Sequence, residues 1–221
     1  MGWPPPRPDE LPRAIAVFPL SGALLLPRGK LPLNIFEPRY LAMTEDALAA
    51  GRMFGMIQPD PKAPLGLSGA GLYRIGCLGR LSSFSETEDG RLLITLTGLI
   101  RFAVEHELDI NRGYRRVRPD FSDFLADLNQ DTAPTGVERE ALLAALRGYF
   151  GRRHFEANWD AIRRMPDDAL IVTLAMVCPF EPAEKQALLE ARTQAERATI
   201  LLALLQMGAA EPDSPPGRII S

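Results

Sequence analysis

The sequence contains few of the residues on which metal and redox chemistry depend. It has two histidines and two cysteines among 221 residues. Cys77 and Cys178 lie far apart in apolar surroundings, which is typical of buried free thiols rather than of a disulfide. His106 stands between two glutamates and His154 follows two arginines, so neither belongs to a zinc-binding pattern such as His-Glu-x-x-His. We therefore expect no metal and no cofactor.

Long hydrophobic runs are also missing. The longest, residues 169–180, is too short to cross a hydrocarbon layer of ~30 Å. The first residues, Met1-Gly2-Trp3-Pro4-Pro5-Pro6-Arg7, lack the apolar core of a signal peptide. These features predict a cytoplasmic protein with no membrane partner.

Positive charge is too sparse for a strong nucleic-acid footprint. The formal net charge is −3. Residues 14–120 are slightly basic and residues 121–221 are acidic, so neither half has the large positive excess that phosphate binding favours. This distribution disfavours nucleic acid as the partner.

Catalytic motifs are absent as well. Arg28-Gly29-Lys30 is superficially similar to a phosphate-binding loop, but Leu24 replaces its first glycine and Leu31 its Ser or Thr. The serines in the turns and strands do not lie in a Gly-x-Ser-x-Gly elbow. We expect a protein that is not an enzyme.

What the first half contains is a series of short apolar segments separated by turn residues. Residues 14–20, 24–27 and 31–36 are broken by prolines, which suits edge or corner strands. Pro38 suits the first position of a helix that ends at Gly51. Further strands are predicted at 53–58, 72–86, 91–97, 99–108 and 114–119, with a hairpin turn at Asp89-Gly90. This spacing favours a small β-barrel over residues 14–120 with one inserted helix; the proline-rich residues 1–13 are predicted to be a disordered tail.

The second half changes to helical periodicity. Residues 121–134 are polar and predict a linker. Capping boxes at Thr135-x-x-Glu138 and Thr193-x-x-Glu196 open two helices, and the apolar stretch Pro166 to Cys178 predicts a central buried helix. The fold class is therefore α+β, with an α-helical bundle over residues 135–208 and a disordered tail over 209–221.

A family resemblance rests on the opening motifs. Ile15-x-Val17-Phe18-Pro19-Leu20, Leu31-Pro32-Leu33 and Phe36-Glu37-Pro38-Arg39-Tyr40 resemble the amino-terminal domain of Lon proteases, and the similarity continues through Thr97-Gly98-Leu99-Ile100-Arg101-Phe102. The resemblance implies a PUA-like barrel and a stand-alone substrate-binding domain without the ATPase and peptidase domains of full-length Lon. It also implies a polypeptide or protein partner and a link to proteolysis; the oligomeric state stays open.

Seven residues are the candidates for polypeptide binding. A groove beside the first helix and the loop at 59–71 would supply them: Leu33, Phe36, Glu37, Arg39, Tyr40, Leu65 and Leu67. Exposed apolar side chains at these positions would bind unfolded polypeptide segments. The alternative for the apolar residues is core packing, and for Glu37 and Arg39 an ion pair that holds the loop.

Two other functions remain as alternatives. On the strand from Arg112 to Arg118, the side chains of Tyr114, Arg116 and Arg118 are predicted to share a face, where they could stack on and pair with RNA. The competing interpretation of this strand is an edge strand protected by charge. A structural or oligomeric scaffold is the third possibility.

Overall fold

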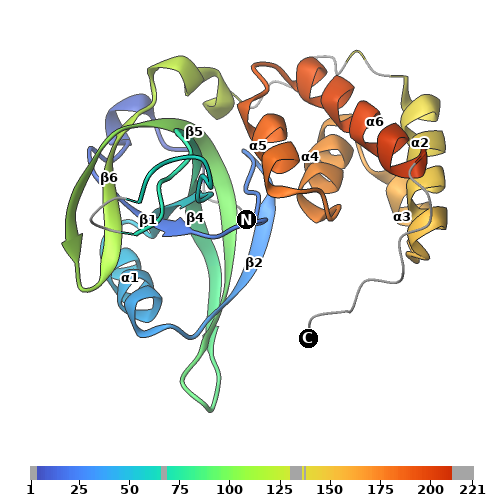
Figure 1. Ribbon diagram of the computed structural model, residues 1–221. Helices are drawn as coiled ribbons and strands as arrows, with labels where there is room; N and C mark the ends of the chain where they lie inside the picture. The colour runs from blue at the N-terminus through green and yellow to red at the C-terminus, as the bar shows by residue number, and fades with distance from the viewer. Residues whose placement is uncertain (1–3, 66–68, 130–135, 137, 211–221) are drawn as a thin grey trace.

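The computed structural model describes residues 4–65, 69–129, 136 and 138–210. A β-rich half with one long helix lies beside an all-helical half, so the α+β class is confirmed (Figure 1). The β-rich half contains the helix α1 (Pro38–Ala49) and six strands: β1 (Ile15–Pro19), β2 (Lys30–Ile35), β3 (Met53–Ile57), β4 (Ile75–Glu86), β5 (Leu92–Asn111) and β6 (Tyr114–Asp120). The other half contains α2 (Arg139–Arg153), α3 (Trp159–Arg164), α4 (Asp167–Val177), α5 (Pro182–Glu190) and α6 (Gln194–Ala210).

Helix α1 begins and ends where the sequence predicts. Pro38 occupies its first turn, after Glu37 at the N-cap in an extended conformation. Gly51 follows the helix with a φ of +81°, a conformation that glycine adopts without strain. At the start of α6 the Thr193 hydroxyl accepts a hydrogen bond from the Glu196 N–H at 3.1 Å, as its capping box predicts. Thr135, in the other capping box, lies outside the described residues.

The six strands form one sheet in the order β2-β5-β4-β3-β1-β6, and β6 pairs with β5 as well. The pairings of β5, β4, β3, β1 and β6 therefore return to their starting strand, while β2 extends the sheet beside β5. All pairs are antiparallel except β1 with β3. The prediction that β6 is an edge strand is wrong, because β1 and β5 bind it on both sides.

One long strand replaces two predicted short ones. Residues 91–97 and 99–108 both belong to β5, which is 20 residues long and pairs with β2, β4 and β6. The ladder between β4 and β5 shifts register at Leu78/Gly79, opposite Gly98. A Cβ at Gly98 would overlap the carbonyl oxygen of Leu26, whose backbone lies directly against the strand. Glycine at position 98 thus lets the chain pass close to β5 without interrupting it.

The segment expected to be a linker packs as structure. Residues 122–128 form a 3₁₀ helix, η2 (Ser122–Leu128), which lies against β5. The polar sequence does not predict this packing, because the contact with the sheet is made by a carboxylate. Asp127 forms an ion pair with the buried Arg101 of β5. At the N-terminus, residues 8–10 form a 3₁₀ turn, η1, within the predicted tail. The remainder of the predicted linker, 130–134, lies outside the described residues.

Arg101 joins three parts of the chain at one point. Its Nε and Nη2 donate to the two carboxylate oxygens of Asp127 at 2.8 and 2.9 Å. Its Nη1 donates to the carbonyls of Leu189 and Ala191 at the end of α5, at 3.1 and 2.6 Å. The Arg197 guanidinium reaches the same helix end, and burial lowers its pKa to about 10. The sheet, η2 and the helical half therefore share one buried polar junction.

Other polar contacts dock α5 on the sheet. The Gln58 amide donates to the Pro182 carbonyl and to Gln186 Oε1, at 3.0 and 3.1 Å. Lys185 Nζ donates to the Gly22 carbonyl at 2.7 Å, and burial lowers the pKa of this lysine. Because each of these side chains reaches a partner on the other half, the contacts fix the orientation of α5 as well as its position.

Replacing Arg101 with Met is expected to destabilise the fold by about 3 kcal/mol, because it leaves the largely buried Asp127 carboxylate without its cation. Urea unfolding followed by circular dichroism measures the change. Arg118→Met is the matched control: its 3.0 Å pair with Glu105 is exposed, so the loss is expected to stay below about 1 kcal/mol. If Arg101→Met does not fold, Asp127→Asn provides the measurement; losses equal to that of the control would contradict the role of the junction.

The same glycine-to-alanine substitution is expected to have opposite effects at two positions. Gly98→Ala forces the Leu26 backbone away from β5 and should cost about 1–3 kcal/mol. Gly151→Ala, in helix α2 with nothing within 4 Å of the new methyl group, should stabilise by about 0.5–1 kcal/mol. Urea denaturation of both variants measures the difference, and equal shifts would refute the close approach at Gly98.

Candidate functional site

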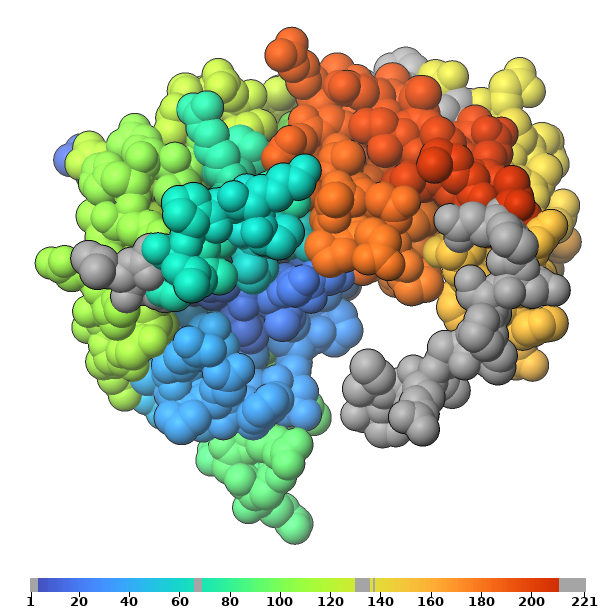
Figure 2. Space-filling view, in the orientation of Figure 1, coloured from blue at the N-terminus to red at the C-terminus, as the bar shows by residue number. Residues whose placement is uncertain are grey.

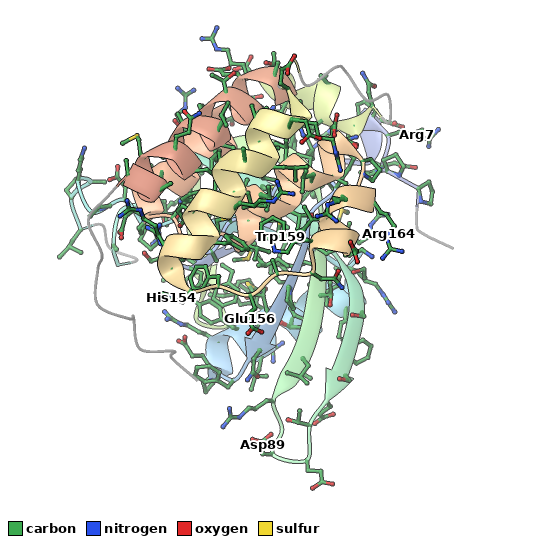
Figure 3. All side chains as sticks on the ribbon, turned by 90° about the vertical axis from the view of Figure 1, so that its right-hand side faces the viewer. Arg7, Asp89, His154, Glu156, Trp159 and Arg164 are labelled. Atoms are coloured by element: carbon green, nitrogen blue, oxygen red, sulfur yellow. The ribbon has the colours of Figure 1, made fainter. Side chains whose placement is uncertain are left out.

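The β4–β5 hairpin and β2 extend the sheet away from the closed set of strands. Figure 3 shows Asp89 at the tip of this hairpin, projecting beyond the rest of the molecule. Within the part of the chain that the structure describes, β2 pairs with β5 alone, so its other edge is unpaired. Pro32 suits this position, because an edge strand does not need every N–H.

Strand register decides which apolar side chains of this extension are exposed. Leu92, Ile94 and Leu96 point to the core side of β5, whereas Leu93 points outward and is 46% exposed. Leu93 pairs with Asn34 of β2, which is also exposed. The outer face of the extension therefore presents an apolar side chain that sequence reasoning placed in a strand but did not single out.

Phe36 lies at the end of β2, near this face. Its side chain is 61% exposed although Ile35 beside it is buried. The Arg91 guanidinium lies 5.8 Å from the centre of its ring. Leu33 is half-buried, on the opposite face, where it pairs with the buried Ile94. Of the predicted binding residues, Phe36 thus offers a large exposed apolar surface and Leu33 a smaller one.

Phe84 on β4 completes this group. It pairs with Ile94, as Leu33 does from the other side, and it is 50% exposed because the hairpin extends past the core. We name Leu33, Phe36, Phe84 and Leu93 the hairpin surface; it covers both faces of the extension, because Leu33 and Phe84 lie on the face of Ile94 and Leu93 lies on the opposite one. Sequence reasoning missed Phe84 and Leu93; the signal was the alternation along β4 and β5, which becomes decisive only with the register between the strands.

The remaining predicted residues near α1 behave differently. Arg39 donates two hydrogen bonds to Glu37 Oε2, at 3.0 and 2.8 Å, so these residues form the ion pair given as their alternative. Tyr40 is 5% exposed and packs on Phe18, with ring centres 4.0 Å apart, and burial raises its pKa. The interpretation of Tyr40 as a binding residue is therefore corrected: it faces the core, because the first turn of α1 directs it toward β1.

The loop between β3 and β4 contains the last two candidates. Leu65 is 83% exposed, the largest value among the exposed large hydrophobic side chains of the described chain. Leu67 lies outside the described residues. The base of the loop is held by a pairing of Pro59 with Leu72 and by a 2.7 Å hydrogen bond from Arg115 to the Ala70 carbonyl.

The predicted RNA-binding strand presents few free groups. Tyr114 is 5% exposed and donates a hydrogen bond to Asp46 at 2.7 Å, so it does not share an open face with Arg116 and Arg118. This corrects the prediction for Tyr114; its cause is the packing of α1 against β6. Arg118 forms an exposed ion pair with Glu105, and Arg116 is half-buried.

Neighbouring arginines are also neutralised. Arg112 donates to Asp46 at 2.6 Å and to Glu45 at 2.9 Å. Arg115 is buried and donates to Glu107 at 3.0 Å. Since carboxylates accompany these guanidinium groups, the positive potential that would attract a phosphate backbone is weak here.

Within the described residues, neither a metal-binding cluster nor a membrane-spanning helix adds to this site. In residues 4–65, 69–129, 136 and 138–210, no three His, Cys, Asp or Glu side chains come together as a cation would require. A helix of the length and apolarity needed to cross a membrane does not occur in the same ranges. Figure 3 shows His154 at the end of α2. It caps this helix in a left-handed conformation, and its backbone N–H is directed at the carbonyls of Gly151 and Phe150.

Comparison with known proteins identifies the family. The model of the substrate-binding domain of ATP-dependent protease La (LON) matches residues 14–207. The chain therefore belongs to the family of LON substrate-binding domains.

Full-length relatives are much longer than this chain. Lon protease 2 of Sorangium cellulosum is 28% identical over 167 residues, which are 74% of this chain and 18% of that protein. Lon protease of Syntrophus aciditrophicus is 23% identical over 194 residues, 82% of this chain and 23% of that protein. The chain thus spans about a fifth of the length of these curated relatives.

Solved structures share the fold. A Lon N-terminal domain protein from Xanthomonas campestris superposes with a TM-score of 0.59 at 22% identity, covering 86% of this chain and 97% of that one. The N-terminal domain of the Mycobacterium avium complex Lon protease gives 0.57 at 15% identity, covering 87% and 97%. The resemblance recognised from the opening motifs is confirmed.

Replacing Tyr114 with Phe tests the hydrogen bond that its hydroxyl donates to Asp46. The hydrogen bond from its hydroxyl is the main cause that lowers the pKa of Asp46 from its usual value, so the variant should show a higher Asp46 pKa. A carboxylate with a depressed folded pKa stabilises the fold above its unfolded pKa, and this stabilisation is lost as pH falls through the folded pKa. The variant should therefore be less stable than the original protein near neutral pH and approach it in strong acid.

Carbon-13 NMR titration of the carboxyl groups measures the Asp46 pKa, and urea unfolding measures stability at each pH. Tyr73→Phe is the control, because the half-buried Tyr73 is not hydrogen-bonded to Asp46. An Asp46 pKa that is the same in Tyr114→Phe as in the original protein would contradict the assignment.

Proposed function

We propose that this protein binds extended polypeptide segments without chemical catalysis, in the context of protein quality control or proteolysis. The observation that carries the proposal is the exposure of Phe36, Phe84 and Leu93 around the end of an unpaired edge strand. Large exposed apolar side chains beside a free strand edge suit a site that binds another extended chain. Membership of a substrate-binding family supports the same function.

The proposed binding mode combines two kinds of contact. An extended segment can add to the free edge of β2 through main-chain hydrogen bonds, which do not depend on its sequence. Apolar side chains of the segment can then rest on the hairpin surface. Main-chain pairing with a small apolar contribution suits a receptor for many different unfolded chains. The exposed Leu65 adds a further apolar contact to this proposal.

A PUA-like barrel is the finer description of the β-rich half that we propose. The pairing of β5 with both β4 and β6 supports it, because that pairing closes the set of strands. RNA binding through Arg116 and Arg118 is the second candidate function that this type of barrel permits. The ion pairs of Arg112, Arg115 and Arg118 make it the weaker candidate.

A scaffold role stays the third candidate, and it requires a permanent interface over the hairpin surface. A cytoplasmic location, the absence of a cofactor and cooperation with a protease remain predictions. Sedimentation at several protein concentrations separates the scaffold from the receptor, because a permanent assembly that covers Phe36 would block polypeptide binding.

Substituting the hairpin surface is expected to weaken polypeptide binding. Phe36→Ser and Leu93→Ser should each raise the dissociation constant for a fluorescent, reduced and carboxymethylated protein by about fivefold, because each removes roughly 1 kcal/mol of apolar contact. Ile110→Ser is the matched control: it lies on the same strand as Leu93 and is similarly exposed, at 51% against 46%. Fluorescence anisotropy measures all three variants.

Two results would contradict the proposal. One is the absence of binding to the unfolded probe at concentrations where a single-stranded RNA of similar length binds. The other is a loss of binding affinity in Ile110→Ser as large as that in Leu93→Ser, which would place the contact away from the hairpin surface.

A further inference from the structure

A groove lies where the start of β2 meets helix α4, at the junction of the two halves. Its volume is about 330 Å³. One wall is the chain at residues 28–30, and the other is a stripe along α4: Asp168, Ala169, Val172, Thr173, Met176 and Val177. Figure 2 shows the surface hollowed where the blue β2 region approaches orange α4.

The α4 wall is more apolar than the core alone requires. The core side of this helix is supplied by Leu170, Ile171 and Leu174, which are all buried. On the groove side, Val177 is 70% exposed and Met176 is half-buried. Val172, Met176 and Val177 therefore give the α4 side of the groove an apolar character.

The floor of the groove is formed by Gly29 and Met176. A Cβ at Gly29 would overlap the Met176 sulfur, so these residues are in direct contact. Methionine is flexible and polarisable, and it adapts to varied apolar partners. The groove therefore has an adaptable apolar floor between the start of β2 and helix α4.

The rim of the groove is positively charged. Arg28 reaches Asp168 at 3.4 Å, which compensates one charge. Lys30 is exposed, and within the described parts of the chain its ammonium has no carboxylate partner. The net charge at the groove is thus +1, counted as Arg28 and Lys30 against Asp168. This charge is complementary to a carboxylate.

The groove and the hairpin surface lie at opposite ends of one strand. Lys30 begins β2, and Phe36 directly follows its last residue. Lys30 and Asn34 pair with Thr97 and Leu93 on the outer face of the sheet. Six residues of extended chain span roughly 20 Å, so one polypeptide strand along the free edge of β2 can reach both sites.

We infer that the groove binds the acidic end of an extended polypeptide segment. In this segment an apolar side chain is followed by Asp or Glu. The apolar side chain rests on Met176 and Val177, and the carboxylate pairs with Lys30. The rest of the segment lies along β2 toward Phe36. This inference rests on the proposed function and specifies its substrate class.

Charge exchange tests the inference. The probes are two fluorescein-labelled peptides of about ten residues, alternating Val and Thr and ending in two Glu or in two Lys. Lys30→Glu should weaken binding of the Glu peptide about five- to tenfold at low salt, because an attraction becomes a repulsion of similar size. The same variant should strengthen binding of the Lys peptide, and high salt should reduce both changes.

Lys62→Glu is the matched control, since Lys62 is an exposed lysine in the β3–β4 loop, outside the groove. It should leave the ratio of the two peptide affinities unchanged. Val177→Ser should weaken both peptides by a similar factor, because it removes an apolar contact and no charge.

The outcomes separate this inference from the proposed function. If Phe36→Ser weakens both peptides while Lys30→Glu and Val177→Ser change neither, the groove is refuted and the hairpin surface stands. If the original protein binds neither peptide nor the unfolded protein probe, both proposals fail. A peptide preference that Lys62→Glu reverses as strongly as Lys30→Glu would also overturn the groove, because the effect would then be one of net charge.

Discussion

The buried guanidinium of Arg101 is the constraint on which the arrangement of the two halves depends. One side chain satisfies a carboxylate on η2 and two carbonyls at the end of α5. A charge in this position is tolerable only when all of its partners are present, because a buried ion without its counter-ion is expensive. The sheet, the 3₁₀ helix and the helical half must therefore assemble together.

The exposed apolar residues follow from this arrangement. The core is continuous from the β-rich half into the helices through residues such as Leu24 and Leu25, so the hairpin extension does not need to bury its own side chains. Phe36, Phe84 and Leu93 can then remain at the surface. On the opposite side of the sheet, the arginines of the β5–β6 region are held by carboxylates. The free edge of the sheet at β2 is thus flanked by exposed apolar side chains, whereas the β5–β6 region is paired on both sides and carries neutralised charges.

Sequence periodicity predicted which segments form helices and strands better than it predicted which elements pack against them. Alternation located the β4–β5 hairpin, and Pro38 with Gly51 located α1. The same reasoning failed for Tyr40 and Tyr114, because a helical turn or a strand has two faces and the sequence does not say which of them another element will cover. It also treated the segment containing Asp127 as a linker, since one functional carboxylate among several aspartates has no distinguishing pattern.

The sequence by itself determined the fold class, most element boundaries and the family, because these depend on local conformational preferences and on short motifs. Only the tertiary structure decided which apolar residues are exposed, which arginines are neutralised, and that a groove lies at the start of the edge strand β2. Those properties depend on strand register and on contacts between residues more than a hundred positions apart, such as Arg28 with Asp168. Long-range contacts of this kind leave no periodic signal in a single chain.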